Sequence, residues 1–239
     1  MRNYVEPDGI YPDLERFGDY LIFKDVSEEI IDDDILEYYG VVNDYARRTI
    51  YRFINLGSES SGNRISLTDP GAFCIMDTGV FERLTNQRFI NEGFGDVLVF
   101  GLGFGFTLLP LLADPAVKSI TVVENNREII NKIPTYLAKV DGVKKIRIVE
   151  GDANTYYNSI GSQKFDYIYF DHFYNFNRTI VKKMNRLKPR YEASVRTDTK
   201  ESARKSKEYV DEVRAEYSKA LRNPQAKIAY WGEDFLNNL

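Results

Sequence analysis

Residues 97–105, Val-Leu-Val-Phe-Gly-Leu-Gly-Phe-Gly, restrict the possible folds of this 239-residue chain more than any other stretch. The four apolar residues are typical of a buried strand in a parallel sheet. The three alternating glycines favour a tight turn whose backbone a ligand can approach closely. An apolar segment that favours a helix, residues 106–113, comes next, and the start of a helix offers unpaired N–H groups. The stretch therefore predicts a strand, a glycine turn and a helix, although a glycine triplet alone also fits a turn that binds nothing.

An acid or a glycine follows each of the next three apolar runs. Glu124 ends the run 120–124, about 20 residues after the glycine turn, where nucleotide-binding units of this kind place an acid for ribose hydroxyls. The run 146–149 leads into Glu150-Gly151-Asp152-Ala153, and the run 165–170 leads into Asp171-His172-Phe173. Because parallel strands end at one edge of a sheet, we expect these groups to line that edge. The pattern predicts an α/β fold: a Rossmann-like, doubly wound, mostly parallel sheet with helices on both faces.

The ordered set of the glycine turn, Glu124, Gly151-Asp152-Ala153 and Phe165-Asp166-x-x-x-x-Asp171 resembles the class I S-adenosylmethionine-dependent methyltransferases, over about residues 95–175. The resemblance implies that Glu124 accepts hydrogen bonds from both ribose hydroxyls. It also implies that Asp152 binds the adenine amino group and that the N–H of Ala153 reaches a ring nitrogen. Asp152 equally suits a helix N-cap. The cofactor-binding residues implied are Gly101, Gly103, Gly105, Glu124, Asp152 and Ala153.

Within that superfamily, three features are similar to the spermidine synthases, which use decarboxylated S-adenosylmethionine. Val99 stands two positions before the first glycine, where most methyltransferases have an acid. Residues 151–156 resemble the adenine-contacting motif of those enzymes, and residues 73–82 resemble the hairpin before their Rossmann unit. The departures from the family are Phe104 in the glycine turn, Gln87-Arg88-Phe89 in place of a Tyr-His-Glu element, and Asp171-His172-Phe173-Tyr174 in place of an Asp-Ser-Ser-Asp-type loop. They leave polyamine recognition open.

The catalytic candidates are Asp171, His172 and Tyr174. Asp171 stands where the superfamily places a group that faces the acceptor, so it would orient or deprotonate an amine, or else hold the loop. His172 is the only histidine of the chain and has a reference pKa that suits a base, but a histidine beside an acid is as often a partnered surface residue. Tyr174 lies between Phe173 and Phe176, and together they suggest an aromatic wall that stacks a planar acceptor or belongs to the core.

Composition indicates a soluble, cytoplasmic enzyme. The single cysteine, Cys74, excludes an internal disulfide and a cysteine-rich zinc site, and it suits a reducing compartment. We expect no metal. The N-terminus lacks the charged-then-apolar pattern of a signal peptide. Residues 97–113 are uncharged, but glycines and Pro110 interrupt them and they fall short of the ~20 residues that span a bilayer, so we expect no membrane partner.

Two regions are expected. Residues 1–92 form an N-terminal α+β extension, with strands at 20–23 and 49–54, a helix at 27–39, a hairpin around 77–79 and a helix at 81–91. Residues 93–239 form the Rossmann-like S-adenosylmethionine-binding domain, with helices at 106–113, 127–140, 155–160 and 176–187, a charged helix at 199–222 and a last strand at 227–231. About five of the seven strands of a full methyltransferase sheet are found. We expect the final antiparallel pair to be missing or replaced by the N-terminal region.

Charge is unevenly spread although the net charge is only −4. Residues 1–40 hold twelve acids, and residues 178–207 hold eleven Lys or Arg. Such a basic segment can contact nucleic-acid phosphates, but a solvated face, or docking on the acidic region of this or a partner chain, is favoured. The charged helix carries an apolar stripe that predicts core packing, with a homodimer seam as the alternative: Val210, Val213, Tyr217, Ala220 and Leu221.

We therefore expect an S-adenosylmethionine-dependent methyltransferase whose acceptor is a small molecule such as an amine, with a pocket that the N-terminal extension helps to form. A guanidino-type methyltransferase is one specific form of this hypothesis. An aminopropyltransferase of the spermidine synthase kind would use the same scaffold with the decarboxylated cofactor. A non-catalytic binding or scaffold protein on the same fold is the alternative from a different class.

Overall fold

The structure is a computed structural model that describes residues 2, 4–27, 48–56, 73–172, 204, 207–223, 225–231 and 233. The chain divides into two compact units. Met1–Glu6, Thr85–Phe173 and Glu201–Leu239 form the first, which we call the parallel-sheet unit. Pro7–Leu84 and Tyr174–Lys200 form the second, the antiparallel-sheet unit. No helix of the described segments is long and apolar enough to cross a membrane.

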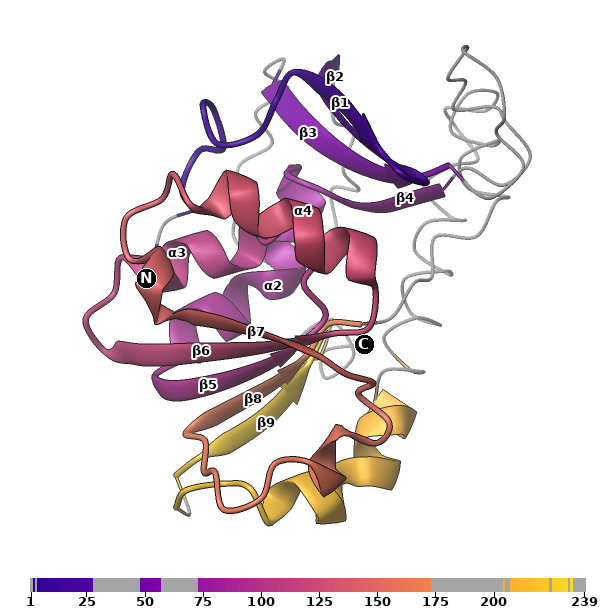
Figure 1. The fold of residues 1–239 in the computed structure, drawn as a ribbon. Helices are drawn as coiled ribbons and strands as arrows, with labels where there is room; N and C mark the ends of the chain where they lie inside the picture. The colour runs from indigo at the N-terminus through magenta and orange to yellow at the C-terminus, as the bar shows by residue number, and fades with distance from the viewer. Residues whose placement is uncertain are drawn as a thin grey trace. The chain divides into compact units, whose positions relative to one another are not determined.

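The parallel-sheet unit is built on five strands that run in one direction, in the order β7-β6-β5-β8-β9 (Figure 1). These strands are β5 (Gly95–Phe100), β6 (Val117–Glu124), β7 (Ile146–Glu150), β8 (Tyr167–Phe170) and β9 (Lys227–Tyr230). Residues 97–100 of β5 are at most 1% exposed, as expected of a strand that is covered on both faces. The sequence-based prediction of a mostly parallel α/β sheet is confirmed, and all five predicted strands are present.

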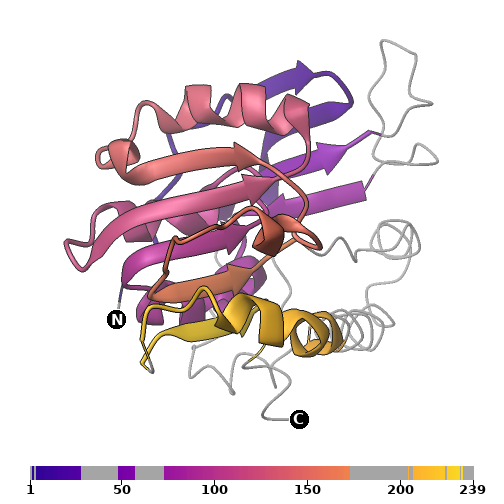
Figure 2. The ribbon, with the colours of Figure 1, turned by 60° about the horizontal axis from the view of Figure 1, so that its bottom comes forward.

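Helical segments cover both faces of this sheet. They are α2 (Val80–Glu92), η1 (Phe106–Leu108), α3 (Leu109–Leu112), α4 (Arg127–Leu137), η2 (Val143–Lys145), η3 (Tyr156–Asn158) and the helical residues 207–218. Figures 1 and 2 show α3 and α4 on one face, with η3 and helix 207–218 on the other. The predicted helix 106–113 is a 3-10 turn followed by a single α-helical turn, and the predicted helix 155–160 is only a 3-10 turn. Ser27, the first residue of the predicted helix 27–39, ends the strand β2, and the rest of that helix and the predicted helix 176–187 lie outside the described residues.

Aromatic side chains attach the helices to the two faces. On one face the ring of Phe89 in α2 stacks on that of Tyr169 in β8, with 4.0 Å between centroids. The hydroxyl of Tyr169 donates a 2.7 Å hydrogen bond to Oδ1 of Asn86, also in α2. On the other face the buried ring of Tyr217 lies edge-on against Phe100 of β5 and Phe170 of β8. Edge-to-face and stacked contacts of this kind each add about 0.5–1.5 kcal/mol beyond the area that they bury.

The strand order places a topological switch point between β5 and β8. From β5 the chain first moves outward through β6 and β7, and later returns to the other side of β5 for β8 and β9. The segments that follow β5 and β8 therefore leave the sheet side by side. The N–H of Gly101 bonds to the carbonyl of Val123 at 2.9 Å, and the N–H of Asp171 bonds to the carbonyl of Phe100 at 2.8 Å. Open α/β sheets bind ligands at such a point, beyond the carboxyl ends of the strands.

The antiparallel-sheet unit contains four strands in the order β1-β2-β3-β4. They are β1 (Leu14–Phe17), β2 (Tyr20–Ser27), β3 (Arg48–Asn55) and β4 (Phe73–Asp77). The predicted strands 20–23 and 49–54 are thus confirmed. These strands pair with one another and not with the parallel sheet, so within the described residues the N-terminal region does not complete that sheet.

The hairpin predicted around residues 77–79 is wrong. The strand β4 ends at Asp77 and α2 begins at Val80, so the chain passes directly from strand to helix. The carboxylate of Asp77 accepts a 2.8 Å hydrogen bond from the N–H of Gly79. An Asp side chain that bonds to the backbone two residues later forms its own turn, and here that turn opens a helix instead of joining two strands. The helix predicted at 81–91 is confirmed as α2.

Replacement of Gly101 by Ala is expected to destabilise the fold strongly. Gly101 has φ of +96°, and a Cβ atom there would lie 2.0 Å from the carbonyl oxygen of Asp171. Left-handed strain and overpacking together should cost about 2–5 kcal/mol, measured by urea unfolding.

Gly161→Ala is the matched control, because Gly161 also has a positive φ, +63°, but nothing lies within 4 Å of its Cβ position. It should cost only about 1–2 kcal/mol. Equal losses in the two variants would show that the contact with Asp171 does not restrain the turn.

Candidate active site

The glycine turn after β5 has the backbone shape that the sequence predicts. Gly101, Gly103 and Gly105 have φ values of +96°, +51° and +79°, and no other residue type adopts a positive φ in the described chain. The side chains between them, Leu102 and Phe104, are at most 3% exposed and anchor the turn in the core. The Cβ position of Gly101 is filled by the backbone of Asp171, so this glycine is required by the packing of the protein itself.

Glu124 lies at the carboxyl end of β6 and is only 3% exposed. Its Oε2 accepts a 2.9 Å hydrogen bond from the N–H of Leu102, in the middle of the glycine turn. Its Oε1 accepts 2.9 Å hydrogen bonds from the N–H groups of Asn125 and Asn126. The carboxylate therefore binds the loop after β5 to the loop after β6 and has its charge stabilised by three backbone donors.

This arrangement limits what else Glu124 can accept. A carboxylate has about four lone-pair positions, and three of those of Glu124 are used by backbone N–H groups. One further hydrogen bond from a ligand hydroxyl fits without rearrangement. Acceptance of two ribose hydroxyls requires one N–H to be released.

The segment after β7 presents Asp152 to solvent. Oδ1 of Asp152 accepts hydrogen bonds from the N–H and from the side-chain amide of Asn154, at 2.8 and 2.7 Å. Its carbonyl accepts the N–H of Tyr156 at 2.8 Å. Asp152 therefore closes a turn before η3, while Thr155 occupies the N-cap position of that short helix. The exposed carboxylate keeps lone pairs available for a ligand amino group.

Ala153 is buried beneath this turn. Its carbonyl is bonded by Tyr217, which the sequence predicts only as part of the apolar stripe. The hydroxyl of Tyr217, in helix 207–218, donates a hydrogen bond to the carbonyl of Ala153, and Tyr217 itself is fully buried. The ring of Tyr157 lies edge-on against Tyr217, 5.6 Å away. Helix 207–218 therefore supports the segment for which adenine contact is predicted.

Asp171 and His172 follow β8 directly and are both half-buried. Burial raises the pKa of Asp171 to about 7, because water no longer stabilises the carboxylate. Burial lowers the pKa of His172 to about 4, and the negative charge of Asp152 opposes this shift. The structure thus brings His172 into electrostatic range of Asp152. At neutral pH the imidazole of His172 is therefore uncharged, and the carboxyl of Asp171 is present in both its protonated and its ionised form. Tyr174, the third catalytic candidate, lies outside the described residues.

The ring of His172 belongs to an aromatic cluster. It lies 4.9 Å from the ring of Tyr209, which approaches it edge-on from helix 207–218. The rings of Phe170 and Phe100 lie 5.9 and 6.4 Å from it. Tyr209 is not among the site residues predicted from the sequence. Its position eight residues before Tyr217, on the same helix, places both rings toward the sheet, and this spacing was the signal available.

The apolar stripe of helix 207–218 packs into the core of the same chain. Val210, Tyr217 and Ala220 are at most 5% exposed, and the partly buried Val213 and Leu221 pack against the same cluster. Core packing, the favoured interpretation of this stripe, is confirmed. Most of the basic segment 178–207 lies outside the described residues, so nucleic-acid contact stays a prediction.

Comparison with known proteins yields only weak likenesses. No family model matches the chain, and no curated protein is similar to it in sequence. Among solved structures, the O-methyltransferase TomG from Streptomyces achromogenes is 17% identical, with a TM-score of 0.32, over 37% of this chain and 42% of that one. The CcbJ methyltransferase from Streptomyces caelestis is 14% identical, with a TM-score of 0.35, over 60% of this chain and 46% of that one.

A putative caffeoyl-CoA O-methyltransferase from Staphylococcus aureus is 22% identical, with a TM-score of 0.30, over 36% of this chain and 41% of that one. The chain thus spans less than half the length of each of these three structures. At such scores the fold assignment rests on the order and direction of the strands, which the structure gives directly.

Tyr217→Phe is expected to destabilise the protein by about 1–3 kcal/mol. The substitution keeps the ring but leaves the buried carbonyl of Ala153 without the hydroxyl donor. Thermal unfolding measures the loss. Tyr157→Phe is the matched control, since Tyr157 contacts the same cluster through its ring and only partly buries its side chain. A silent Tyr217→Phe variant would show that the hydroxyl does not support the Ala153 segment.

Proposed function

We propose that this protein is an S-adenosylmethionine-dependent methyltransferase that acts on a small acceptor such as an amine. The observation that carries the proposal is the buried carboxylate of Glu124, bonded to the glycine turn at the switch point between β5 and β8. Rossmann-like sheets use an acid at this place for ribose hydroxyls. The strand-end acids expected from the sequence all lie at the carboxyl ends of β6, β7 and β8.

The residues present suit an adenosine-containing cofactor. Glu124 would accept a ribose hydroxyl, the exposed carboxylate of Asp152 would accept the adenine amino group, and the N–H of Ala153 would donate to a ring nitrogen. Gly101, Gly103 and Gly105, which all adopt a positive φ, would shape the turn whose backbone lies next to the cofactor. Bound S-adenosylmethionine would supply an activated methyl group on a sulfonium, so that the protein mainly has to position the acceptor and remove its proton.

Asp171 is the group proposed to face the acceptor. A carboxyl whose pKa lies near 7 can, in its ionised form, take the proton of an ammonium acceptor, or the proton that a neutral amine must lose after it has taken the methyl group, and return it to water. His172 is proposed as secondary, because its low pKa makes it a weak base and its ring is packed against Tyr209. Its uncharged, aromatic surface would instead line the pocket.

Aminopropyl transfer is the alternative function. The resemblance of residues 151–156 to the adenine-contacting motif of the spermidine synthases supports it. Val99 also supports it, because it is a buried apolar residue where most methyltransferases have an acid. The choice between the two activities depends on which form of the cofactor binds. Calorimetric titration with S-adenosylmethionine, S-adenosylhomocysteine and decarboxylated S-adenosylmethionine decides it, followed by a transfer assay against a panel of amines. If none of the three binds, the proposed function is wrong.

Glu124→Gln is expected to weaken binding of S-adenosylhomocysteine at least tenfold. The wild type should bind with a micromolar dissociation constant, which corresponds to a binding free energy of about −8 kcal/mol. A hydrogen bond to a charged acceptor contributes about 1.5–3 kcal/mol of this. Because Glu124 also holds three backbone N–H groups, circular dichroism must confirm that the variant is folded at the assay temperature.

Glu150→Gln is the matched control, since Glu150 ends the neighbouring strand β7 but is exposed and paired with Arg127 at 2.7 Å. It should leave affinity within a factor of two or so. Equal affinities of the folded Glu124→Gln variant and the wild type would remove Glu124 from the cofactor site.

Asp171→Asn is expected to lower turnover by about 10²–10⁴, the contribution of a positioned acid or base, while cofactor affinity changes only a few-fold. Wild-type turnover should rise as the pH increases through about 7, because Asp171 must lose its proton to act as a base. His172→Gln should reduce turnover much less and keep the pH profile. The opposite ranking of the two variants would show that their roles are reversed.

The raised pKa of Asp171 can also be tested without an acceptor, through the dependence of protein stability on pH. The folded protein holds the proton of Asp171 more tightly than the unfolded chain, so this group makes the wild type lose stability as the pH rises from about 4 to about 7. Asp171→Asn removes this loss. The variant should therefore gain stability relative to the wild type across that window, as measured by urea unfolding at several pH values. A pH-independent difference would mean that Asp171 is not desolvated.

A further inference from the structure

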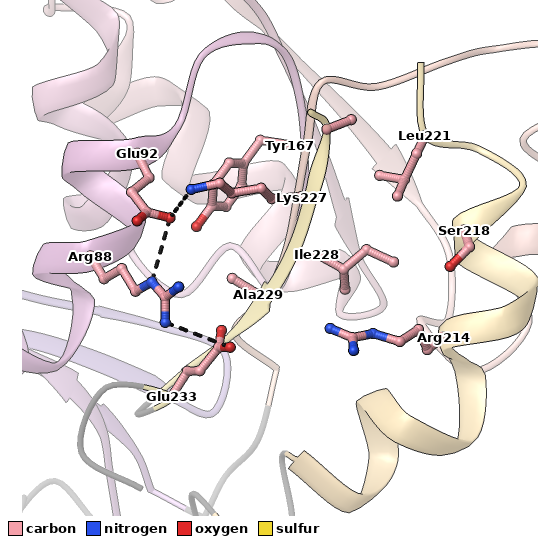
Figure 3. A pocket seen from close by; sticks show the side chains of 11 residues that line it. Arg88, Glu92, Tyr167, Arg214, Ser218, Leu221, Lys227, Ile228, Ala229 and Glu233 are labelled. Carbon is pink, nitrogen blue, oxygen red and sulfur yellow. Dashed lines mark hydrogen bonds and ion pairs between the residues drawn. The ribbon is translucent and has the colours of Figure 1, made fainter. Parts of the chain in front are cut away.

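A hollow lies in the parallel-sheet unit, and its lining includes none of the candidate active-site residues. Its volume is about 360 Å³, which is within the range of small-ligand pockets. The last turns of α2, the strand β9 and helix 207–218 line it (Figure 3). Tyr167 and Lys227, the paired first residues of β8 and β9, belong to its lining. The hollow follows the outer edge of β9, from Ala226 just before the strand to Glu233 just after it, and none of the candidate active-site residues line it. We call it the β9 groove.

Ion pairs neutralise one side of the β9 groove. The guanidinium of Arg88 lies 3.4 Å from a carboxylate oxygen of Glu92 and 3.6 Å from one of Glu233. The ammonium of Lys227 lies 2.9 Å from the same oxygen of Glu92. Two bases and two acids thus compensate one another, as the dashed lines of Figure 3 show.

Arg214 is the fifth charged residue of the groove, and no acid of the described segments pairs with it. Its guanidinium forms no ion pair or hydrogen bond with any residue of the described segments, and Figure 3 shows it directed from helix 207–218 into the groove. Ser218 lies four residues later, on the same side of helix 207–218, and Leu221 follows just after the end of that helix. Both line the groove together with Arg214. The lining therefore carries one net positive charge beside a hydroxyl group.

The floor of the β9 groove is apolar. Ala226, Ile228 and Ala229 line it and are each at most 9% exposed, and the partly buried side chain of Leu221 lies beside them. Little of this apolar surface is still exposed, so a ligand that covers it gains only a small hydrophobic contribution, at about 25 cal/mol for each Å² removed from water. The groove thus combines an apolar floor with a cation that has no anionic partner among the described residues.

We propose that the β9 groove binds a small organic acid, with its carboxylate on Arg214 and Ser218 and its apolar part against Ile228 and Leu221. A guanidinium pairs with a planar carboxylate through two parallel N–H···O bonds. A dianionic phosphate fits less well, because the carboxylates of Glu92 and Glu233 line the same groove and repel a second negative charge. The proposal is independent of the methyl-transfer function, since the groove shares no residue with the candidate active site.

Benzoate is the probe, with benzamide as its uncharged counterpart and inorganic phosphate as a competing anion. Titrations of the full chain followed by NMR should show saturable benzoate binding with a dissociation constant on the order of 1 mM, as for a single exposed charge pair on an apolar floor. Benzamide and phosphate should bind at least tenfold more weakly. Absence of saturable benzoate binding, or equal binding of phosphate, would overturn the proposal.

Variants of helix 207–218 locate the site. Arg214→Gln should weaken benzoate binding at least tenfold, because it removes the charged donors. Ser218→Asp should do the same by placing a carboxylate one turn from Arg214, where it pairs with the guanidinium. Lys219→Gln is the matched control: it removes an exposed charge just after the end of this helix that is paired with Glu216 and does not line the groove. Equal weakening by Lys219→Gln would mean that benzoate responds only to net charge, and the proposed site would be wrong.

Discussion

Gly101 lies so close to the backbone of Asp171 that no side chain fits between them, and the carboxyl edge of the parallel sheet depends on this contact. The two segments come from the strands that flank the switch point, and main-chain hydrogen bonds hold both of them to β5 and β6. Glu124 then fastens the same glycine turn through the N–H of Leu102. The candidate residues are therefore positioned by backbone and short side chains, which have little conformational freedom to lose when a ligand binds.

The chemistry proposed for this edge follows from differences in how its carboxylates are surrounded. Glu124 is buried, and its carboxylate accepts hydrogen bonds from three backbone N–H groups, which leaves room for one from a ligand hydroxyl. Asp152 is exposed and faces water. Burial raises the pKa of Asp171 toward neutrality, which suits proton exchange with an acceptor. Three acids of similar type thus have three different surroundings, and the task proposed for each acid follows from them.

The sequence predicted the strands well and the turns less well, for physical reasons. Strands such as β5 and β8 are buried on both faces, so they appear as continuous apolar runs that need no tertiary information. The predicted hairpin at 77–79 failed because the carboxylate of Asp77 forms a local turn with Gly79, and a turn of this kind opens a helix as readily as it joins strands. The role of Tyr209 was not predicted, because the sequence of a helix does not show which ring an aromatic side chain will contact in a distant segment such as that of His172.

By itself the sequence determined the α/β class, the five parallel strands and the places of Gly101, Glu124, Asp152 and Asp171 at strand ends, because these follow from local hydrophobic periodicity and chain order. Only the tertiary structure decided what those residues touch. Contacts such as Gly101 with Asp171, Tyr217 with Ala153 and Tyr209 with His172 join residues 37 to 70 positions apart. The solvation of Asp171 and the uncompensated charge of Arg214 are likewise properties of surroundings assembled from distant segments. Such proximity arises when the whole chain packs, and no local pattern encodes it.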